Sequence, residues 1–257
     1  MVEHHRFCGA KPAPTPNERK AFETKALVII MARGILFDFN GTLFFDSELH
    51  VKAFEIIFVR FGRPKPTREF IISNILGRTD ARIYRDNFDP NASDEVCANF
   101  HRQKMELYFE LCLEKQDIFK LTDGAAEMLD YLKEKGVPFT IATGSDGNEV
   151  DFFFKHLGLG KWFDKEKIIF TNGTFNGKPA PDCYLLAAEK IGLPASDCIV
   201  FEDGTSGVIA ATNAGVEGIV AVHESTVPSP LNGEVKVDSV HHDLTEWKSI
   251  LANYGLM

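Results

Sequence analysis

The feature that most restricts the fold is an apolar run that stops abruptly at a polar turn. Residues Gly34–Phe37 form the run, and Asp38-Phe39-Asn40-Gly41-Thr42 follows it. A continuous apolar run is typical of a strand buried on both faces of a parallel sheet. Gly41 permits a tight turn directly afterwards. The pattern therefore predicts a central strand over Gly34–Phe39, with a carboxylate at the edge where open α/β sheets place their chemistry.

Four further apolar runs alternate with helical patterns along the chain. The runs, which predict strands, are Val137–Ala142, Lys167–Phe170, Cys198–Phe201 and Gly218–His223. Apolar residues at helical spacing occur at Ala125–Lys135, Asn148–Leu157, Pro181–Ile191 and Ser206–Ala214. Alternation of this kind predicts an α/β fold with a doubly wound parallel sheet.

The long interval between the first two predicted strands has almost no strand signal. Helical spacing recurs at Leu49–Phe61 and Ser93–Leu113, with prolines between them. Because connections this long are uncommon inside a compact domain, we predict an inserted α-helical cap over residues 48–115. The α/β core then comprises residues 34–47 and 116–257. Residues 1–33 are predicted to be a flexible extension, because residues 1–25 are polar and contain three closely spaced prolines.

Composition restricts the partners and the compartment. The formal net charge of −9 disfavours nucleic acid or an anionic membrane as a partner. The five cysteines form no C-x-x-C pair, which favours reduced thiols over a disulfide framework. No apolar run has the length needed to cross a membrane. We therefore expect a cytoplasmic protein that is a monomer or a weak homodimer.

Four polar segments contain the candidate site residues. Of the first two, one carries a single carboxylate and the other is uncharged. The first holds Asp38, Asn40 and Thr42. The second is Thr143-Gly144-Ser145, which directly follows a predicted strand. Hydroxyl and backbone N–H groups at a helix start can hold a phosphate without a cation. Either segment could also be an ordinary turn or helix cap.

The other two segments carry more charge. Lys178 lies between Gly177 and Pro179, and its ammonium group can neutralise a phosphate or a carboxylate. Glu202-Asp203 follows another predicted strand. Two adjacent carboxylates at the end of a buried strand are costly unless a cation neutralises them. Oxygen ligands of this kind suit Mg²⁺.

In order and approximate spacing, the four segments resemble the four motifs of the haloacid dehalogenase-like superfamily. The resemblance extends over about residues 34–222. Within the superfamily, Asp46-Ser47-Glu48-Leu49-His50 is similar to the branch of β-phosphoglucomutases and phosphoglycolate phosphatases. It implies a phosphatase-type hydrolase that acts on a small phosphorylated metabolite.

The resemblance also implies roles for individual residues. Asp38 would attack phosphorus and form an aspartyl phosphate, while Thr143 and Lys178 would bind the phosphoryl oxygens. The implied substrate contacts further include Thr42, Gly144, Ser145, His50, Gly77 and Arg78. Mg²⁺ would be held by Asp38, the backbone carbonyl of Asn40 and Asp203, with Glu202 as a direct or indirect partner.

Asn40 departs from the family pattern, which has a second Asp at this position. In family phosphatases that Asp transfers a proton to the leaving oxygen and then from water, and an amide cannot do so. Positioned acid–base catalysis is typically worth about 10²–10⁴-fold. We therefore expect Mg²⁺ and phosphate binding with reduced turnover. His50 matches a linker histidine of the same branch and is either a substitute for the missing acid or a hinge residue packed at the cap boundary.

Other chemistries of the superfamily fit the residues less well. Phosphonatases use a cap lysine, and the cap loop at residues 76–82 has none. Dehalogenases place an aromatic residue where Asn40 stands and need no metal-binding pair. A sugar-phosphate mutase stays an alternative, although Asp146 and Asp80 occupy positions where similar mutases carry Lys and Arg. A non-catalytic phosphate-binding protein is the other alternative.

Overall fold

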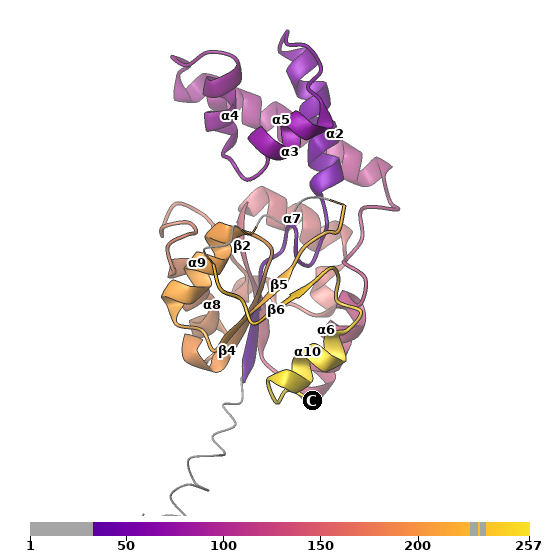
Figure 1. Cartoon of the computed structure of the whole chain (residues 1–257), viewed down its shortest axis with the longest axis vertical. Helices are drawn as coiled ribbons and strands as arrows, with labels where there is room; N and C mark the ends of the chain where they lie inside the picture. Colours follow the sequence, from indigo (N-terminus) through magenta and orange to yellow (C-terminus); the bar gives the residue numbers. More distant parts are fainter. Residues whose placement is uncertain (1–32, 227–230, 232–234) are drawn as a thin grey trace, which may run out of the picture.

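The computed structural model describes residues 33–226, 231 and 235–257. The predicted N-terminal extension therefore lies outside the described residues, except for Arg33. Six strands form one sheet in the order β3-β2-β1-β4-β5-β6, and every neighbouring pair is parallel (Figure 1). The strands are β1 (Gly34–Phe37), β2 (Phe139–Asp146), β3 (Ile169–Thr171), β4 (Cys198–Glu202), β5 (Gly218–Val222) and β6 (Ser239–His241). The predicted parallel α/β sheet is confirmed.

Strand β1 lies in the interior of the sheet, between β2 and β4. Phe37 pairs with Ile141 on one side and with Phe201 on the other. This register brings the carboxyl ends of the three strands to the same edge of the sheet. The polar residues that follow β1 and β4 therefore lie side by side with those at the end of β2.

Helices cover both faces of the sheet because side chains alternate along each strand. Ile35 and Phe37 belong to the apolar cluster that contains residues of α6 (Ala125–Lys135), α7 (Gly147–His156) and α10 (Trp247–Asn253). Leu36 belongs to the cluster on the opposite face, with residues of α8 (Asp182–Lys190) and α9 (Thr205–Ala214). The core is thus a three-layer α/β/α arrangement.

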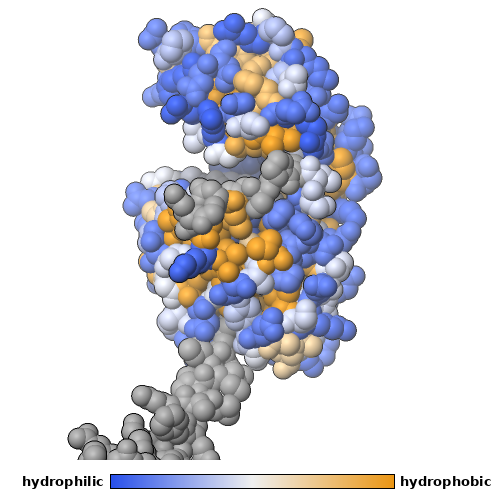
Figure 2. Space-filling model, viewed as in Figure 1, coloured by the Kyte–Doolittle hydropathy of each residue, from blue (hydrophilic) through white to orange (hydrophobic). Residues whose placement is uncertain are grey.

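The chain between β1 and α6 is mostly helical and forms a group of its own. It contains α2 (Ser47–Arg60), α3 (Arg68–Asn74), α4 (Asp80–Asn87) and α5 (Asp94–Glu114). These helices, here called the helical segment, pack around a separate apolar cluster that includes Ile57, Ile71 and Phe100. The segment stands beyond the carboxyl edge of the sheet (Figure 1). Figure 2 shows the surface hollowed between it and the α/β layers.

Several elements differ from the sequence-based prediction. β2 continues through Thr143-Gly144-Ser145 to Asp146, so the expectation that these three residues follow the strand was wrong. Strand β6 and helices α3, α4 and α10 were not predicted because they are only three to eight residues long. In the described parts of the chain, no helix combines the length and apolarity that a membrane span requires.

Candidate active site

Asp38 is a buried carboxylate directly after β1, with 7% of its surface exposed. Its backbone N–H donates to the carbonyl oxygen of Phe201 at 2.9 Å, and this bond fixes the turn against β4. The Lys178 ammonium group donates to Asp38 Oδ1 at 2.5 Å and to Glu202 Oε1 at 2.6 Å. One lysine thus links the residue after β1 to the last residue of β4.

Glu202 is held in place by donors from two helices and their loops. Its Oε1 also accepts from the Tyr184 hydroxyl at 3.0 Å, and its Oε2 accepts from the Gly204 N–H at 2.7 Å. Gly207 leaves the necessary space, because a Cβ atom there would lie 1.5 Å from Oε1. Glu202 therefore has a fixed orientation, and it positions Lys178.

The turn after β1 packs against the Asp203 carboxylate. Gly41 has a φ of +80°, and a Cβ atom there would lie 2.1 Å from Asp203 Oδ2. Carboxylate oxygens of Asp38, Glu202 and Asp203 all lie within 4.8 Å of one another. Hard divalent cations bind oxygen donors in such clusters, so the three carboxylates could hold a metal ion.

The charges at this edge do not balance among themselves, since three carboxylates face one ammonium group. Burial and the neighbouring Glu202 raise the pKa of Asp38 to about 7, although Lys178 acts in the opposite direction. Burial, Glu202 and Asp38 raise the pKa of Asp203 well above its usual range. Burial opposes the charge on Lys178, but the two adjacent carboxylates outweigh it and raise its pKa. A bound cation would offset this excess of negative charge.

Asn40 has hydrogen bonds on both sides of its amide. Its Nδ2 donates to Asp46 Oδ2 at 2.6 Å, and its Oδ1 accepts from the Ser145 hydroxyl at 2.9 Å. Asp46 Oδ2 also accepts from the Tyr108 hydroxyl at 2.7 Å and lies 3.2 Å from His50 Nε2. The Asn40 side chain is therefore fixed between the end of β2 and a buried carboxylate.

A cavity of about 450 Å³ joins most of the predicted catalytic residues. Its lining includes Asp38, Asn40, Thr143, Gly144, Ser145, Lys178, Glu202, Asp203 and His50. Thr42 does not line this cavity. Its hydroxyl is buried with no hydrogen-bond partner among the described residues, and its carbonyl accepts from Thr122.

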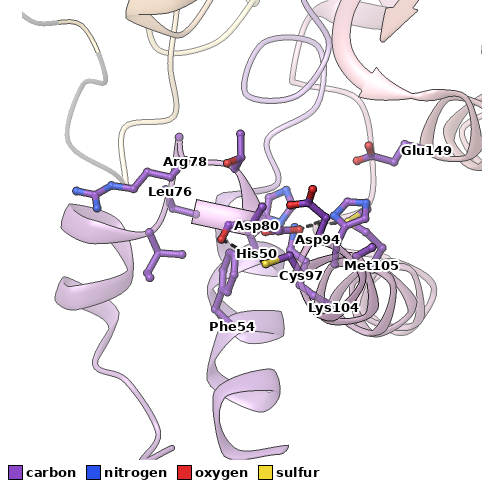
Figure 3. A pocket seen from close by; sticks show the side chains of 16 residues that line it. His50, Phe54, Leu76, Arg78, Asp80, Asp94, Cys97, Lys104, Met105 and Glu149 are labelled. Carbon is purple, nitrogen blue, oxygen red and sulfur yellow. Dashed lines mark hydrogen bonds and ion pairs between the residues drawn. The ribbon is translucent and has the colours of Figure 1, made fainter. Parts of the chain in front are cut away.

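A second cavity of about 560 Å³ lies against the helical segment. Gly77 and Arg78 line it, so the structure places them apart from the Asp38 cavity. Lys104, with 6% of its surface exposed, lies 3.6 Å from Asp80 within this lining. In Figure 3, Glu149 stands apart from the other labelled side chains, which come from the helical segment.

Three residues at or beside the site were not predicted from the sequence: Lys104 and Glu149 line the cavities, and Tyr108 bonds to Asp46. Loop 76–82 has no lysine, but α5 brings Lys104 to the same cavity from a distant part of the sequence. A signal existed: Lys104 and Tyr108 are four residues apart and share the buried face of α5. Glu149 follows Asp146 at capping-box spacing, and both halves of that capping box are present.

Comparisons with known proteins agree with this geometry. A family model described as haloacid dehalogenase-like hydrolase matches residues 35–221. The phosphorylated carbohydrates phosphatase of Thermotoga maritima is 31% identical over 195 residues, which cover 74% of this chain and 85% of that protein.

Solved structures with the same fold include two whose sequences are more than 25% identical to this chain. A HAD hydrolase of family IA, variant 3, from Entamoeba histolytica is 37% identical, with a TM-score of 0.77 over 87% of this chain and 99% of that one. A putative β-phosphoglucomutase from Thermotoga maritima is 26% identical, with a TM-score of 0.66 over 86% and 98% of the two chains.

Proposed function

The chain belongs to the haloacid dehalogenase-like hydrolase family, and from that membership we propose that it is a Mg²⁺-dependent phosphatase of small phosphorylated metabolites. The observation that carries the proposal is the Lys178 ammonium group, held between Asp38 and Glu202 at 2.5 and 2.6 Å. A buried carboxylate fixed beside a cation, at the mouth of a cavity, is suited to attack an anionic phosphate.

In this proposal Asp38 is the nucleophile. One of its carboxylate oxygens attacks phosphorus, the bond from phosphorus to the ester oxygen breaks, and an aspartyl phosphate forms. Lys178 and Thr143 bind the phosphoryl oxygens, and both line the same cavity as Asp38. Ser145 and Gly144 complete that wall. Water then cleaves the aspartyl phosphate and restores the Asp38 carboxylate.

The oxygen donors around Asp38 fit a divalent cation. Asp38, Asp203 and the backbone carbonyl of Asn40 would hold Mg²⁺, with Glu202 beside them. Glu202 already accepts hydrogen bonds at both oxygens, so its main part is to orient Lys178. When bound, the ion would neutralise negative charge between the nucleophile and the phosphate. The unbalanced charge of the carboxylate cluster supports this assignment.

Asn40 limits the turnover in this proposal. Its amide cannot give up or take up a proton near neutral pH, and it is hydrogen-bonded to Asp46 and Ser145. Positioned acid–base catalysis usually contributes about 10²–10⁴-fold. We expect turnover below that of a family phosphatase with a carboxylate at this position.

The arrangement of cavities supports a small ester as the substrate. The Asp38 cavity would hold the phosphate, and the cavity against the helical segment, including Gly77 and Arg78, would hold the esterified group. Both volumes lie in the usual range for small-molecule sites. In this proposal the helical segment is a cap, as predicted for residues 48–115. Phosphorylated carbohydrates are the first class to test, because one relative is named for them.

The test is a screen of phosphate monoesters with and without added Mg²⁺, read as released inorganic phosphate. The expected result is Mg²⁺-dependent release that Asp38→Asn abolishes. Thr122→Ser is a suitable control, since it keeps a hydroxyl at a buried position outside the cavity. Release that persists in Asp38→Asn at the level of the unsubstituted chain would contradict the proposal.

A sugar-phosphate mutase is the second candidate, and one observation favours it. Lys104 is buried in the lining of the second cavity, where its charge could meet another anionic group of a substrate. The protein would then isomerise a sugar phosphate and would not hydrolyse it. Product analysis by ³¹P NMR separates the two, because a mutase moves the phosphate between hydroxyl groups without releasing it.

A further inference from the structure

Asp46 is a buried carboxylate that accepts hydrogen bonds and has no proton to donate. Its Oδ2 accepts from Asn40 at 2.6 Å and from Tyr108 at 2.7 Å, and it faces His50 Nε2 at 3.2 Å. Burial would raise the pKa of Asp46, but the charge and hydrogen bond of His50 and the bonds from Tyr108 and Asn40 lower it. Burial also raises the pKa of Tyr108, so its hydroxyl stays protonated and donates.

His50 is oriented by these contacts. Because Asp46 is an acceptor, His50 Nε2 carries a hydrogen, and the lone pair of a neutral ring lies on Nδ1. The ring stacks on Tyr108 with centroids 4.3 Å apart and planes 12° apart. His50 Nδ1 is buried and has no hydrogen-bond partner among the described residues. A buried acceptor without a partner is costly, and a bound substrate or water would satisfy it.

The position of His50 matches the place where an ester bond would break. His50 and Glu149 are the two residues that line both the Asp38 cavity and the cavity against the helical segment. A phosphate bound beside Asp38, with its esterified group in the second cavity, places the bridging oxygen near this boundary. Glu149 is otherwise engaged, since it accepts from the Asp146 N–H at 3.0 Å.

We propose that His50 is the proton donor and acceptor of the phosphatase reaction, with Asp46 and Asn40 as positioning residues. Asp46 holds the imidazole ring, as the aspartate of a Ser-His-Asp triad does. The amide of Asn40 supplies a donor to Asp46 that a carboxylate could not. The proposal rests on the phosphatase function proposed above and explains how proton transfer proceeds without a second aspartate.

The two half-reactions balance with this single group. When Asp38 attacks phosphorus and the ester bond breaks, the His50 imidazolium gives its Nδ1 proton to the leaving oxygen and becomes neutral. Water then enters from the side that the leaving group occupied. His50 Nδ1 takes one proton from that water as its oxygen bonds to phosphorus and the bond to Asp38 breaks. The products are the alcohol and phosphate, and Asp38 and the imidazolium are restored.

Charged and titratable groups face His50 from each neighbouring helix. Asp46 lies at the start of α2, and Tyr108 and Lys104 belong to α5. The charge of His50 is also felt by Asp80 of α4 and by Glu149 of α7. Three carboxylates, those of Asp46, Asp80 and Glu149, and the ammonium group of Lys104 therefore surround the imidazole ring.

The test compares His50→Gln with the unsubstituted chain on p-nitrophenyl phosphate and on an alkyl phosphate. With the aryl ester the first step needs little proton donation, so His50→Gln should release one equivalent of p-nitrophenol per enzyme in a burst. Steady turnover should then fall about 10²–10⁴-fold. With the alkyl ester both steps should slow and no burst should appear. The pH profile of kcat/KM should lose its histidine limb between about pH 5 and 8.

Controls separate this proposal from a structural effect and from the phosphatase function itself. His156→Gln removes an exposed histidine that contacts Phe152 on α7, and it should change neither turnover nor the pH profile. Added Mg²⁺ and inorganic phosphate should still raise the melting temperature of His50→Gln, which shows an intact site. Full turnover in His50→Gln, or a burst in Glu149→Gln instead, overturns the proposal. Absence of Asp38-dependent turnover in the unsubstituted chain overturns the phosphatase function as well.

Discussion

Asn40 shows how a neighbour can favour an amide over an acid at a single position. Its Nδ2 lies 2.6 Å from the Asp46 carboxylate, and its Oδ1 accepts from Ser145. An aspartate in its place would set a second carboxylate against buried Asp46, and the pair would favour taking up a proton. The residue that departs from the family pattern is thus matched to the charge beside it.

We therefore predict that Asn40→Asp lowers stability and does not restore full acid–base catalysis. Loss of the amide donor to ionised Asp46 should reduce the free energy of unfolding by about 1–3 kcal/mol near neutral pH. The carboxyl pair binds an extra proton only in the folded state, so the loss should grow as the pH rises above about 4. Urea denaturation at several pH values measures this directly.

The double variant Asn40→Asp/Asp46→Asn is the matched control for that prediction. It exchanges the acid and the amide, so a donor and an acceptor face each other again. We expect a favourable coupling energy of about 1 kcal/mol between the two sites in the stability cycle. An Asn40→Asp protein that is as stable as the unsubstituted chain at pH 8 would show that Asp46 does not require the amide.

At the scale of elements, the turn after β1 and the end of β4 form one unit. Gly41 packs against Asp203 and has a positive φ, and Gly207 at the start of α9 makes room for Glu202. These glycines let a turn and a helix approach the two carboxylates closely. Gly41 and Gly207 are therefore needed for the positions of the Asp203 and Glu202 carboxylates as well as for the fold.

Gly41→Ala should impair Mg²⁺ binding beyond its effect on the backbone. The new Cβ atom would lie 2.1 Å from Asp203 Oδ2, so the carboxylate must move. Gly62→Ala is the matched control, because Gly62 has a φ of +79° against +80° for Gly41 and has nothing within 4 Å of its Cβ position.

Thermal melting with and without Mg²⁺ measures the difference between these two variants. Both should melt below the unsubstituted chain, because alanine is strained at positive φ. Only Gly41→Ala should lose most of the stabilisation that Mg²⁺ gives. Equal stabilisation of the two variants by Mg²⁺ would place the ion away from Asp203.

At the scale of the whole molecule, the buried charge cluster links global stability to pH and to metal. Without metal, burial and Glu202 raise the pKa of Asp38 from 3.8 to about 7. Between those values the folded state binds more protons than the unfolded state. The free energy of unfolding should therefore fall as the pH rises across that window, by about 1.4 kcal/mol for each pKa unit at most.

Chemical denaturation of EDTA-treated protein between pH 4 and 8 tests this linkage. The decline should be smaller in Asp38→Asn, which has no charge to bury at that position. Added Mg²⁺ should stabilise the protein more at pH 8 than at pH 5, since the ion favours ionised carboxylates. A stability that is flat in pH for the metal-free, unsubstituted chain would contradict the charge imbalance described here.

Several features were already determined by the sequence. Apolar runs such as Gly34–Phe37 and Cys198–Phe201 predicted buried strands, and the helical patterns between the runs predicted parallel pairing. The family and the phosphatase-type hydrolase expected from the four motifs are confirmed by the comparisons. The cap boundaries, the residue roles, the oligomeric state and the compartment stay predictions. Local periodicity and motif order were sufficient for the fold because both are written into consecutive residues.

The surroundings of Asn40 could only be decided by the tertiary structure. Tyr108 bonds to Asp46 from 62 positions away in sequence, and Ser145 bonds to Asn40 from 105 positions away. Lys104 likewise enters the second cavity from a helix that looked amphipathic and ordinary. Hydrogen bonds and charge neutralisation depend on distances of a few ångströms between distant segments, and spacing along the chain does not contain those distances. The sequence therefore identified which acid was missing, and the packing of α2, α5 and β2 around position 40 decided what stands beside it.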